Sequence, residues 1–121
     1  MIIHRIRFDN YRAYYGEVVF DFPIEDGRNV SIIFANNDVG KTCFFSGILF
    51  CLYGNQDNDN LQDMINVNAQ REGIYQSSVT IFAEQEGEEI SITRDISLRG
   101  SIKDDVSSKD FRSTLVITKG D

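Results

Sequence analysis

The chain has 121 residues, of which 41% are hydrophobic and one is proline, and its formal net charge is −7. This length and composition suit one folded domain with a modest core and exclude a disordered chain. No apolar run reaches the roughly 20 residues that a membrane-spanning helix needs, and the first residues lack a secretory signal. The sequence therefore predicts a single cytoplasmic domain, residues 1–121, with no membrane partner.

The negative charge is concentrated in the middle of the chain. Residues 51–90 contain eight acidic residues and one basic residue, so they carry −7, whereas residues 1–50 sum to −1 and residues 91–121 to +1. An acidic chain has no overall electrostatic surface for nucleic acid. DNA, if it is a partner, is expected to be reached through a local patch or through other parts of a larger assembly.

Three strands are expected in the first third of the chain. Residues 2–9 alternate around Ile6 and Phe8, and residues 17–22 read Glu-Val-Val-Phe-Asp-Phe, so these two segments are expected to form an antiparallel ribbon. Residues 29–34, Asn-Val-Ser-Ile-Ile-Phe, are mostly apolar and β-branched, as a buried strand should be.

A candidate phosphate-binding loop follows the third strand. Gly40, Lys41 and Thr42 match the end of the pattern G-x-x-x-x-G-K-[ST], and residues 41–53 have apolar side chains at helical spacing. In such a loop, backbone N–H groups at a helix N-terminus bind phosphate, the lysine contacts the β- and γ-phosphates, and the Thr hydroxyl binds Mg²⁺. The predicted nucleotide-binding residues are Asn36, Asn37, Asp38, Val39, Gly40, Lys41, Thr42 and Cys43, with Thr42 as the metal ligand.

The first glycine of the pattern is replaced by Ala35. Alanine costs on the order of 1–2 kcal/mol there if the position needs a positive φ, and little if φ is negative. Asn36 and Asn37 tolerate tight turns, so the loop can still close. Asp38 adds a negative charge that opposes phosphate binding unless its side chain caps a backbone N–H. These departures leave an alternative open, a catalytically inactive P-loop-fold module with a structural or assembly role.

The second half of the chain is expected to be mostly β-structure. Strands are predicted at residues 75–84, 88–95 and 114–118, the last within the segment 111–118, and the first two are expected to form a hairpin. Residues 55–73 are rich in Asn, Asp and Gln and are expected to be a surface loop with one short helix at residues 61–65. Residues 98–109 are polar and are expected to be a loop.

The cysteine pattern favours buried, reduced thiols. Cys43 and Cys51 are eight residues apart in the predicted helix, a separation of about 12 Å. A disulfide needs Cα atoms within about 7 Å, so these two are not expected to pair. The chain has one histidine and no Cys-x-x-Cys pair, which leaves no support for a zinc site.

These segments resemble the N-terminal half of the head domain of SMC-like ABC ATPases, a group that includes double-strand-break-repair ATPases, RecF- and RecN-type proteins and DndD ATPases. The opening MIIHRIRFDNYRAYYGEVVFDF is similar to their first two strands and aromatic–Arg turn. NVSIIFANNDVGKTCFFSGILFCLYG is similar to their Walker A strand, loop and helix, and LQDMIN and SSVTIFAEQEGEEISITRDI to the segments that follow. The resemblance implies an α/β P-loop NTPase fold, an ABC-ATPase N-terminal lobe with antiparallel β hairpins beside a strand–P-loop–helix unit.

The resemblance also implies a ligand, ATP with Mg²⁺. The family's usual loop is Gly-x-Asn-Gly-x-Gly-Lys-[Ser/Thr]; Asn37 and residues 40–42 align with it, whereas Ala35 and Asp38 depart from it. Arg12 falls where the family's turn approaches the nucleotide phosphates. An arginine in a solvated turn is the equally favoured alternative for that residue.

The family's Q-loop glutamine, signature motif, Walker B carboxylates and switch histidine follow a long coiled coil, and residues 1–121 contain none of them. This chain is therefore expected to bind ATP without useful hydrolysis and to leave apolar surface uncovered. Its expected partners are the C-terminal half of the head, on the same or a separate chain, a second head in a head-to-head dimer, and DNA through the assembly. DNA repair, DNA modification or anti-phage defence is the implied role. A small kinase or GTPase fits poorly, because the best-placed acidic residues, Glu84 and Asp95, belong to a hairpin.

Overall fold

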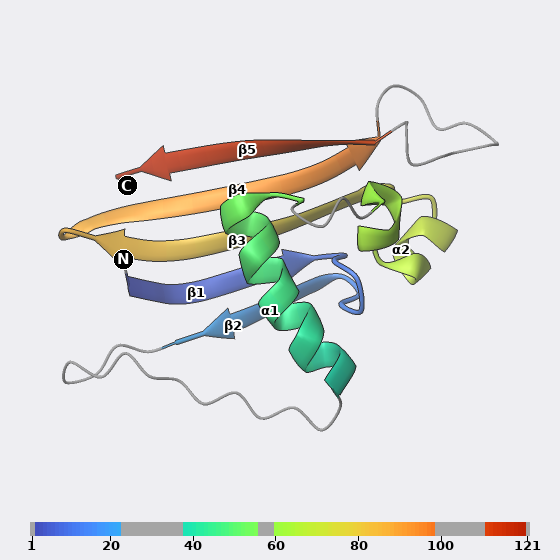
Figure 1. The fold of residues 1–121 in the computed structure, drawn as a ribbon, viewed down its shortest axis with the longest axis horizontal. Helices are drawn as coiled ribbons and strands as arrows, with labels where there is room; N and C mark the ends of the chain where they lie inside the picture. The colour runs from blue at the N-terminus through green and yellow to red at the C-terminus, as the bar shows by residue number, and fades with distance from the viewer. Residues whose placement is uncertain (1, 23–37, 56–59, 99–110, 121) are drawn as a thin grey trace.

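The computed structural model describes residues 2–22, 38–55, 60–98 and 111–120. These residues form one antiparallel sheet in the strand order β2-β1-β3-β4-β5. The strands are β1 (Ile2–Asp9), β2 (Glu17–Asp21), β3 (Gln76–Gln85), β4 (Glu88–Leu98) and β5 (Phe111–Lys119). The helices are α1 (Asp38–Tyr53), the short 3-10 helix η1 (Leu61–Met64) and α2 (Val67–Arg71). Figure 1 shows α1 lying across one face of this sheet.

The two hairpins predicted from the sequence join through β1 and β3, which pair in antiparallel fashion. Ile6 lies opposite Ile81, and Phe8 lies opposite Val79. All four side chains are buried, whereas the residues between them in sequence are more exposed or polar. Because successive side chains of a strand point to opposite faces, this register gives the sheet one apolar face for α1 to cover.

An aromatic cluster holds the N-terminal half of α1 against β1 and β2. The Phe8 ring lies 4.8 Å from the Tyr14 ring and 5.9 Å from the Phe20 and Phe44 rings, measured between ring centres. Phe20 meets Phe44 edge to face at 5.0 Å. Such aromatic contacts add about 0.5–1.5 kcal/mol each beyond the burial of apolar area.

Two glycines set the position of α1. Gly47 faces Phe8 so closely that a Cβ atom would lie 2.3 Å from its Cε1 atom, so only glycine lets the helix approach β1 this far. Gly54 follows the last helical residue with φ of +83°, the left-handed conformation that glycine commonly adopts after a helix C-terminus. Beside it, the Arg94 Nε atom donates to the Cys51 carbonyl oxygen at 3.2 Å and so satisfies one free carbonyl of the helix end.

The element predictions can be compared with this fold. The two opening strands, the helix, the hairpin, the last strand and the short helix after residue 60 are confirmed, and Cys43 and Cys51 are buried and free as expected. The surface-loop prediction for residues 55–73 is wrong in part, because α2 forms there with the Asn66 side chain capping it. β4 continues to Leu98, where a loop was predicted. The predicted strand at residues 29–34 lies outside the described residues, as does most of the predicted loop at residues 98–109. None of the described helices is long and apolar enough to span a membrane.

Candidate nucleotide-binding site

The N-terminus of α1 carries the candidate phosphate-binding residues. The helix begins at Asp38, so Gly40, Lys41 and Thr42 lie in its first turns. The first four N–H groups of a helix have no acceptor within it, which leaves the N–H groups of residues 38–41 available. These groups and the helix dipole favour an anion at this end. The Thr42 side chain is exposed there.

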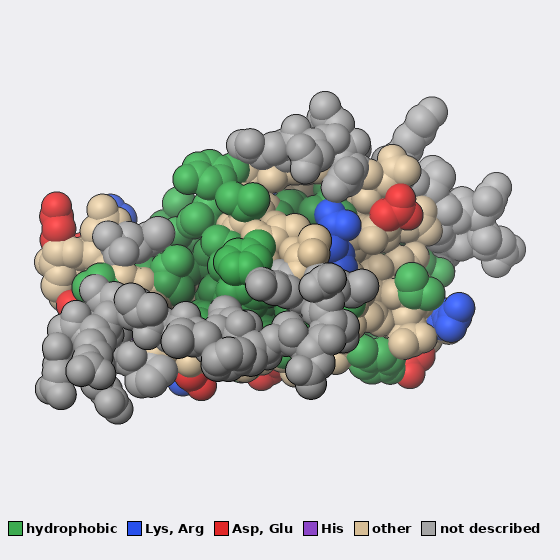
Figure 2. Space-filling model, turned by 60° about the horizontal axis from the view of Figure 1, so that its bottom comes forward, with side chains coloured by type: hydrophobic (Ala, Val, Ile, Leu, Met, Phe, Trp, Pro, Cys, Tyr) green, Lys and Arg blue, Asp and Glu red, His purple; other side chains and the backbone are tan. Residues whose placement is uncertain are grey.

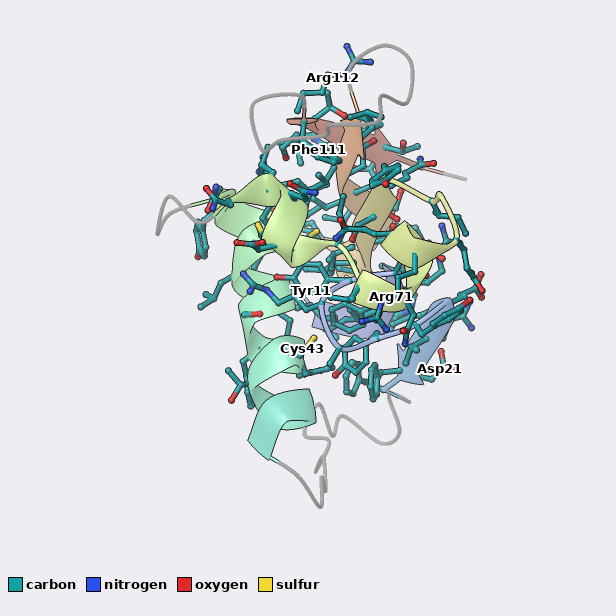
Figure 3. The ribbon with its side chains drawn as sticks, turned by 90° about the vertical axis from the view of Figure 1, so that its right-hand side faces the viewer. Tyr11, Asp21, Cys43, Arg71, Phe111 and Arg112 are labelled. Carbon is teal, nitrogen blue, oxygen red and sulfur yellow. The ribbon has the colours of Figure 1, made fainter. Side chains whose placement is uncertain are left out.

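The turn after β1 is tied to the same part of α1. The Tyr11 side chain is fully buried, and its hydroxyl lies 3.3 Å from the Ser46 Oγ atom. The Cys43 thiol donates to the Tyr11 carbonyl oxygen at 3.7 Å. Figure 3 shows Tyr11 and Cys43 on the side of α1 that faces the strands. The turn therefore contacts α1 at Cys43, the last of the candidate phosphate-binding residues, and at Ser46, about one helical turn further along.

Arg12 is held beside α1 by this turn. Its Nε atom donates to the Tyr11 hydroxyl at 3.1 Å, and its guanidinium carbon lies 5.6 Å from the centre of the Tyr11 ring. The side chain is partly exposed to solvent. Since Tyr11 also contacts Ser46, the positive charge of Arg12 lies close to the N-terminal half of α1.

The backbone of Arg12 is in a left-handed conformation, with φ of +49°. Residues other than glycine reach this region at a cost of about 1–2 kcal/mol. The Arg12 N–H donates to the Met64 carbonyl oxygen at 2.9 Å, and the Asn66 amide donates to the Arg12 carbonyl oxygen at 2.9 Å. The η1–α2 segment thus holds the turn in its strained shape, an arrangement that is common at functional sites.

The buried environment of Cys43 governs its chemistry. Burial raises the pKa of this thiol, although the nearby Arg12 charge acts in the opposite direction. The thiol therefore stays protonated at neutral pH and packs as a small apolar group. Its side chain points into the core, so any role of Cys43 toward a nucleotide belongs to its backbone.

The predicted site residues divide into three groups. Residues 38–42 lie together at the start of α1, and Arg12 lies beside the following turn of that helix. Asn36 and Asn37 lie outside the described residues. Sequence reasoning missed Tyr11, Ser46 and Asn66, which connect Arg12 to α1 and to η1–α2. The aromatic residue before Arg12 was the one available signal, because buried tyrosines usually need a partner for the hydroxyl.

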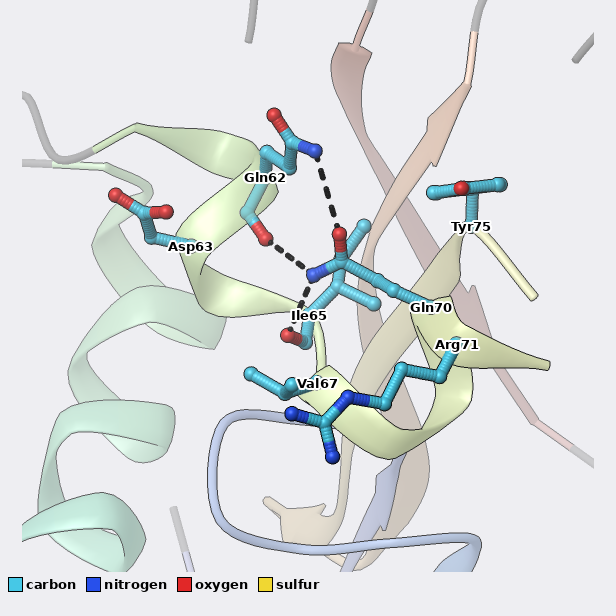
Figure 4. Close-up of a pocket in the computed structure, with 7 residues that line it drawn as sticks. All are labelled: Gln62, Asp63, Ile65, Val67, Gln70, Arg71 and Tyr75. Carbon is cyan, nitrogen blue, oxygen red and sulfur yellow. Dashed lines mark hydrogen bonds between the residues drawn. The ribbon is translucent and has the colours of Figure 1, made fainter. Parts of the chain in front are cut away.

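A hollow with a volume of about 570 Å³ lies between η1 and α2. Figure 4 shows the Gln62, Gln70 and Arg71 side chains in its lining. The Gln70 amide nitrogen donates to the carbonyl oxygens of Gln62 and Ile65, at 2.9 Å and 3.0 Å. The polar groups of Gln70 are therefore used in holding η1 to α2 rather than presented to a ligand.

The donor set at the start of α1 fits a nucleotide with a bound metal ion. Free backbone N–H groups and a lysine suit phosphate oxygens, and an exposed threonine hydroxyl suits Mg²⁺. Within the described residues no cluster of three or more His, Cys, Asp or Glu side chains could hold a metal by itself.

Gly-Lys-Thr in the first turns of a helix that packs on a sheet matches the end of the phosphate-binding loop pattern. The sequence profile of the AAA domain family matches residues 5–120, nearly the whole chain. The chain therefore belongs to the AAA domain family, which is a family of nucleotide-binding ATPase domains. A search of curated proteins finds no match.

Proposed function

We propose that this chain is the ATP- and Mg²⁺-binding N-terminal lobe of an SMC-like ATPase head that acts in DNA repair, DNA modification or anti-phage defence. One observation carries the proposal. The Tyr11 hydroxyl contacts α1 at Ser46, four residues after Thr42, and Arg12 donates to that same hydroxyl. This contact supports the proposal that the N–H groups at the start of α1, Lys41 and Arg12 act on one phosphate site.

Each residue has a distinct role in this proposal. The N–H groups of residues 38–41 bind phosphate oxygens, and Lys41 contacts the β- and γ-phosphates. Thr42 holds the Mg²⁺ ion, which neutralises charge on those phosphates when it is bound with the nucleotide. Arg12 adds a positive charge from the side of the turn, and we assign Asn36 and Asn37, which lie outside the described residues, to the same site. Asp38, as the first residue of α1, is favourable for the helix dipole.

The outer side of α1 suits a partner lobe. Phe45, Leu49 and Tyr53 follow one another at intervals of four residues, and each is more than half exposed. Residues four apart share one helix face, so these side chains form an apolar stripe along the helix. Figure 2 shows a face of the molecule on which hydrophobic side chains gather. We assign this stripe to the C-terminal half of the head, which would supply the Walker B and signature residues and connect the site to a second head and to DNA.

The test is calorimetry with Mg²⁺ and ATP on the wild-type chain, on Lys41→Ala and on Lys119→Ala. Lys119 is an exposed lysine in β5, so Lys119→Ala removes the same charge as Lys41→Ala at a position outside α1. The proposal predicts binding by wild type and Lys119→Ala, at least about tenfold weaker binding by Lys41→Ala, and no turnover in any of the three. No binding by the wild-type chain would instead favour a structural or assembly module.

A further inference from the structure

The strand β5 forms a long edge of the sheet. It pairs with β4 on one side, and no described strand pairs with its other side. The opposite edge of the sheet, β2, has five residues, whereas β5 has nine. Figure 1 shows β5 at the margin of the sheet, on the side away from β2. An edge of this length presents a row of unpaired backbone groups to any strand that can align with it.

The backbone direction of β5 follows from its pairing with β4. The Gly120 N–H donates to the Glu89 carbonyl oxygen at 2.8 Å, and the register runs without a shift from Lys119 to Phe111. In an antiparallel strand, each residue directs its N–H and C=O groups to the same side, and successive residues alternate between the two sides. The residues that direct them away from β4 are therefore Phe111, Ser113, Leu115, Ile117 and Lys119. This set is symmetric about Leu115.

The side chains of β5 lack the usual protection of an edge strand. Leu115, Val116 and Ile117 are exposed, and they lie on both faces of the strand. Natural edge strands are usually interrupted by charges, proline or a bulge. Residues 111–119 contain no proline and no acidic residue, and their two basic residues, Arg112 and Lys119, stand near the ends. The centre of the strand is thus open to pairing.

We propose that a second copy of this chain pairs with β5 in antiparallel fashion about a two-fold axis at Leu115. This register uses all five outward-directed residues of both copies. Ser113 of one copy faces Ile117 of the other, and Thr114 faces Val116, pairs that suit a sheet. Arg112 faces Thr118 and Lys119 faces Phe111, so no like charges lie directly opposite each other. The result is one continuous ten-stranded sheet with a self-complementary interface.

The occupant is a second copy because the edge matches itself. A foreign strand would need the same length, spacing and absence of opposing charge, whereas the two-fold axis at Leu115 supplies them automatically. The apolar stripe on α1 offers no free backbone groups, since its residues lie inside a helix. The proposed dimer does not depend on the nucleotide site, and its test is made without nucleotide.

The first experiment is sedimentation velocity over a wide concentration range on four proteins: wild type, Leu115→Lys, Val67→Lys and Leu49→Lys. Val67 is an exposed apolar residue of α2, so its variant adds the same charge away from β5. Leu49→Lys places the charge on the α1 stripe. Circular dichroism confirms that each variant is folded. The proposal predicts a dimer for wild type and both controls, and dimerisation at least about tenfold weaker for Leu115→Lys, because two lysines then face each other at the axis.

A second experiment tests the register. Paired residues at the axis have Cα atoms about 5.5 Å apart, which a disulfide can bridge. Leu115→Cys is expected to give a covalent dimer on mild oxidation, and Val67→Cys is not. A wild-type chain that stays monomeric at every concentration overturns the proposal. So does a dimer that Leu115→Lys leaves intact, or one that only Leu49→Lys disrupts, since either places the interface elsewhere.

Discussion

The side-chain amide of Asn66 donates a hydrogen bond to the backbone carbonyl oxygen of Arg12 across 2.9 Å, although 54 residues separate the two. The oxygen of the same amide accepts the N–H of Ala69 at 3.1 Å and so caps α2. One buried side chain therefore fixes both a strained turn and the start of a helix. The orientation of Arg12 beside α1 depends on a residue that lies far from the candidate nucleotide site in sequence.

Replacing Asn66 by alanine tests this dependence. The variant leaves the Arg12 carbonyl oxygen without its partner and removes the α2 cap, which together are expected to lower the free energy of unfolding by about 2–4 kcal/mol. Urea unfolding followed by circular dichroism measures the loss. Asn68→Ala is the control, because that side chain is exposed, and it should change stability by less than about 1 kcal/mol. Equal stabilities for the two variants would contradict the role given to Asn66.

The charge of Arg12 is expected to matter for nucleotide binding. Arg12→Gln keeps a side chain of similar length but removes the positive charge, so the affinity for Mg²⁺ and ATP should fall by about 10- to 100-fold. Calorimetry on this variant and on Arg71→Gln separates the effect of position from that of net charge, because Arg71 is exposed on α2. Equal affinities of the two variants for ATP would show that Arg12 has no specific role in binding. This outcome would not bear on the role of Lys41.

The contact between Gly47 and Phe8 predicts that a glycine-to-alanine change, which usually stabilises a helix, destabilises this one. On an exposed helix, changing glycine to alanine stabilises by about 1 kcal/mol. Here the new methyl group would overlap the Phe8 ring, so Gly47→Ala is expected to destabilise by about 1–3 kcal/mol. The double variant Gly47→Ala, Phe8→Leu should recover part of that loss relative to Phe8→Leu alone. Additive losses in thermal or urea unfolding would show that the two sites do not interact.

Stability is expected to fall in alkaline solution. Burial raises the pKa of Cys51 from 9.0 to about 11 and that of Tyr14 from 10.0 to about 12. Both groups are neutral when protonated, so the folded state holds their protons more tightly. Above the unfolded pKa values the unfolded chain binds fewer protons, and the free energy of unfolding decreases as pH rises through this range.

Because of Cys51, the free energy of unfolding is expected to decrease by about 1.4 kcal/mol per pH unit from roughly pH 9 to pH 11. The contribution of Tyr14 is smaller because solvent reaches much of its side chain. Urea unfolding at several pH values measures the slope, and Cys51→Ala should show a shallower one than wild type. A stability that stays constant from neutral pH to about pH 11 would contradict the expectation.

Local patterns account for what the sequence predicts well in this chain. The alternation around Ile6 and Phe8 depends only on residues close in sequence, as does the helical spacing before Gly54. Such patterns predicted β1, β2 and α1 within a few positions. The position of Gly-Lys-Thr at the start of α1 was also predictable, because strand, loop and helix signals coincide there.

Long-range contacts account for what the sequence left undetermined. The pairing of β1 with β3 and the bond from Asn66 to Arg12 join residues more than 50 positions apart, and no local pattern encodes such pairs. α2 was missed because Val67–Arg71 is too short for a periodic signal, and its helical state rests on the Asn66 cap. Arg12 was proposed for the site only through resemblance, and its positive φ is a tertiary effect that no local pattern predicts.

The two buried thiols of α1 allow its opening motions to be measured by thiol labelling of the natural sequence. Cys43 lies in the first half of α1 and Cys51 in the second, both on its buried side. The Cys43 thiol donates to the Tyr11 carbonyl oxygen, and the Cys51 thiol donates to the Val79 carbonyl oxygen. A thiol reagent can reach either one only when the helix lifts from the sheet. Comparing the two labelling rates would therefore show whether α1 opens as one unit or unfolds first at its N-terminal end.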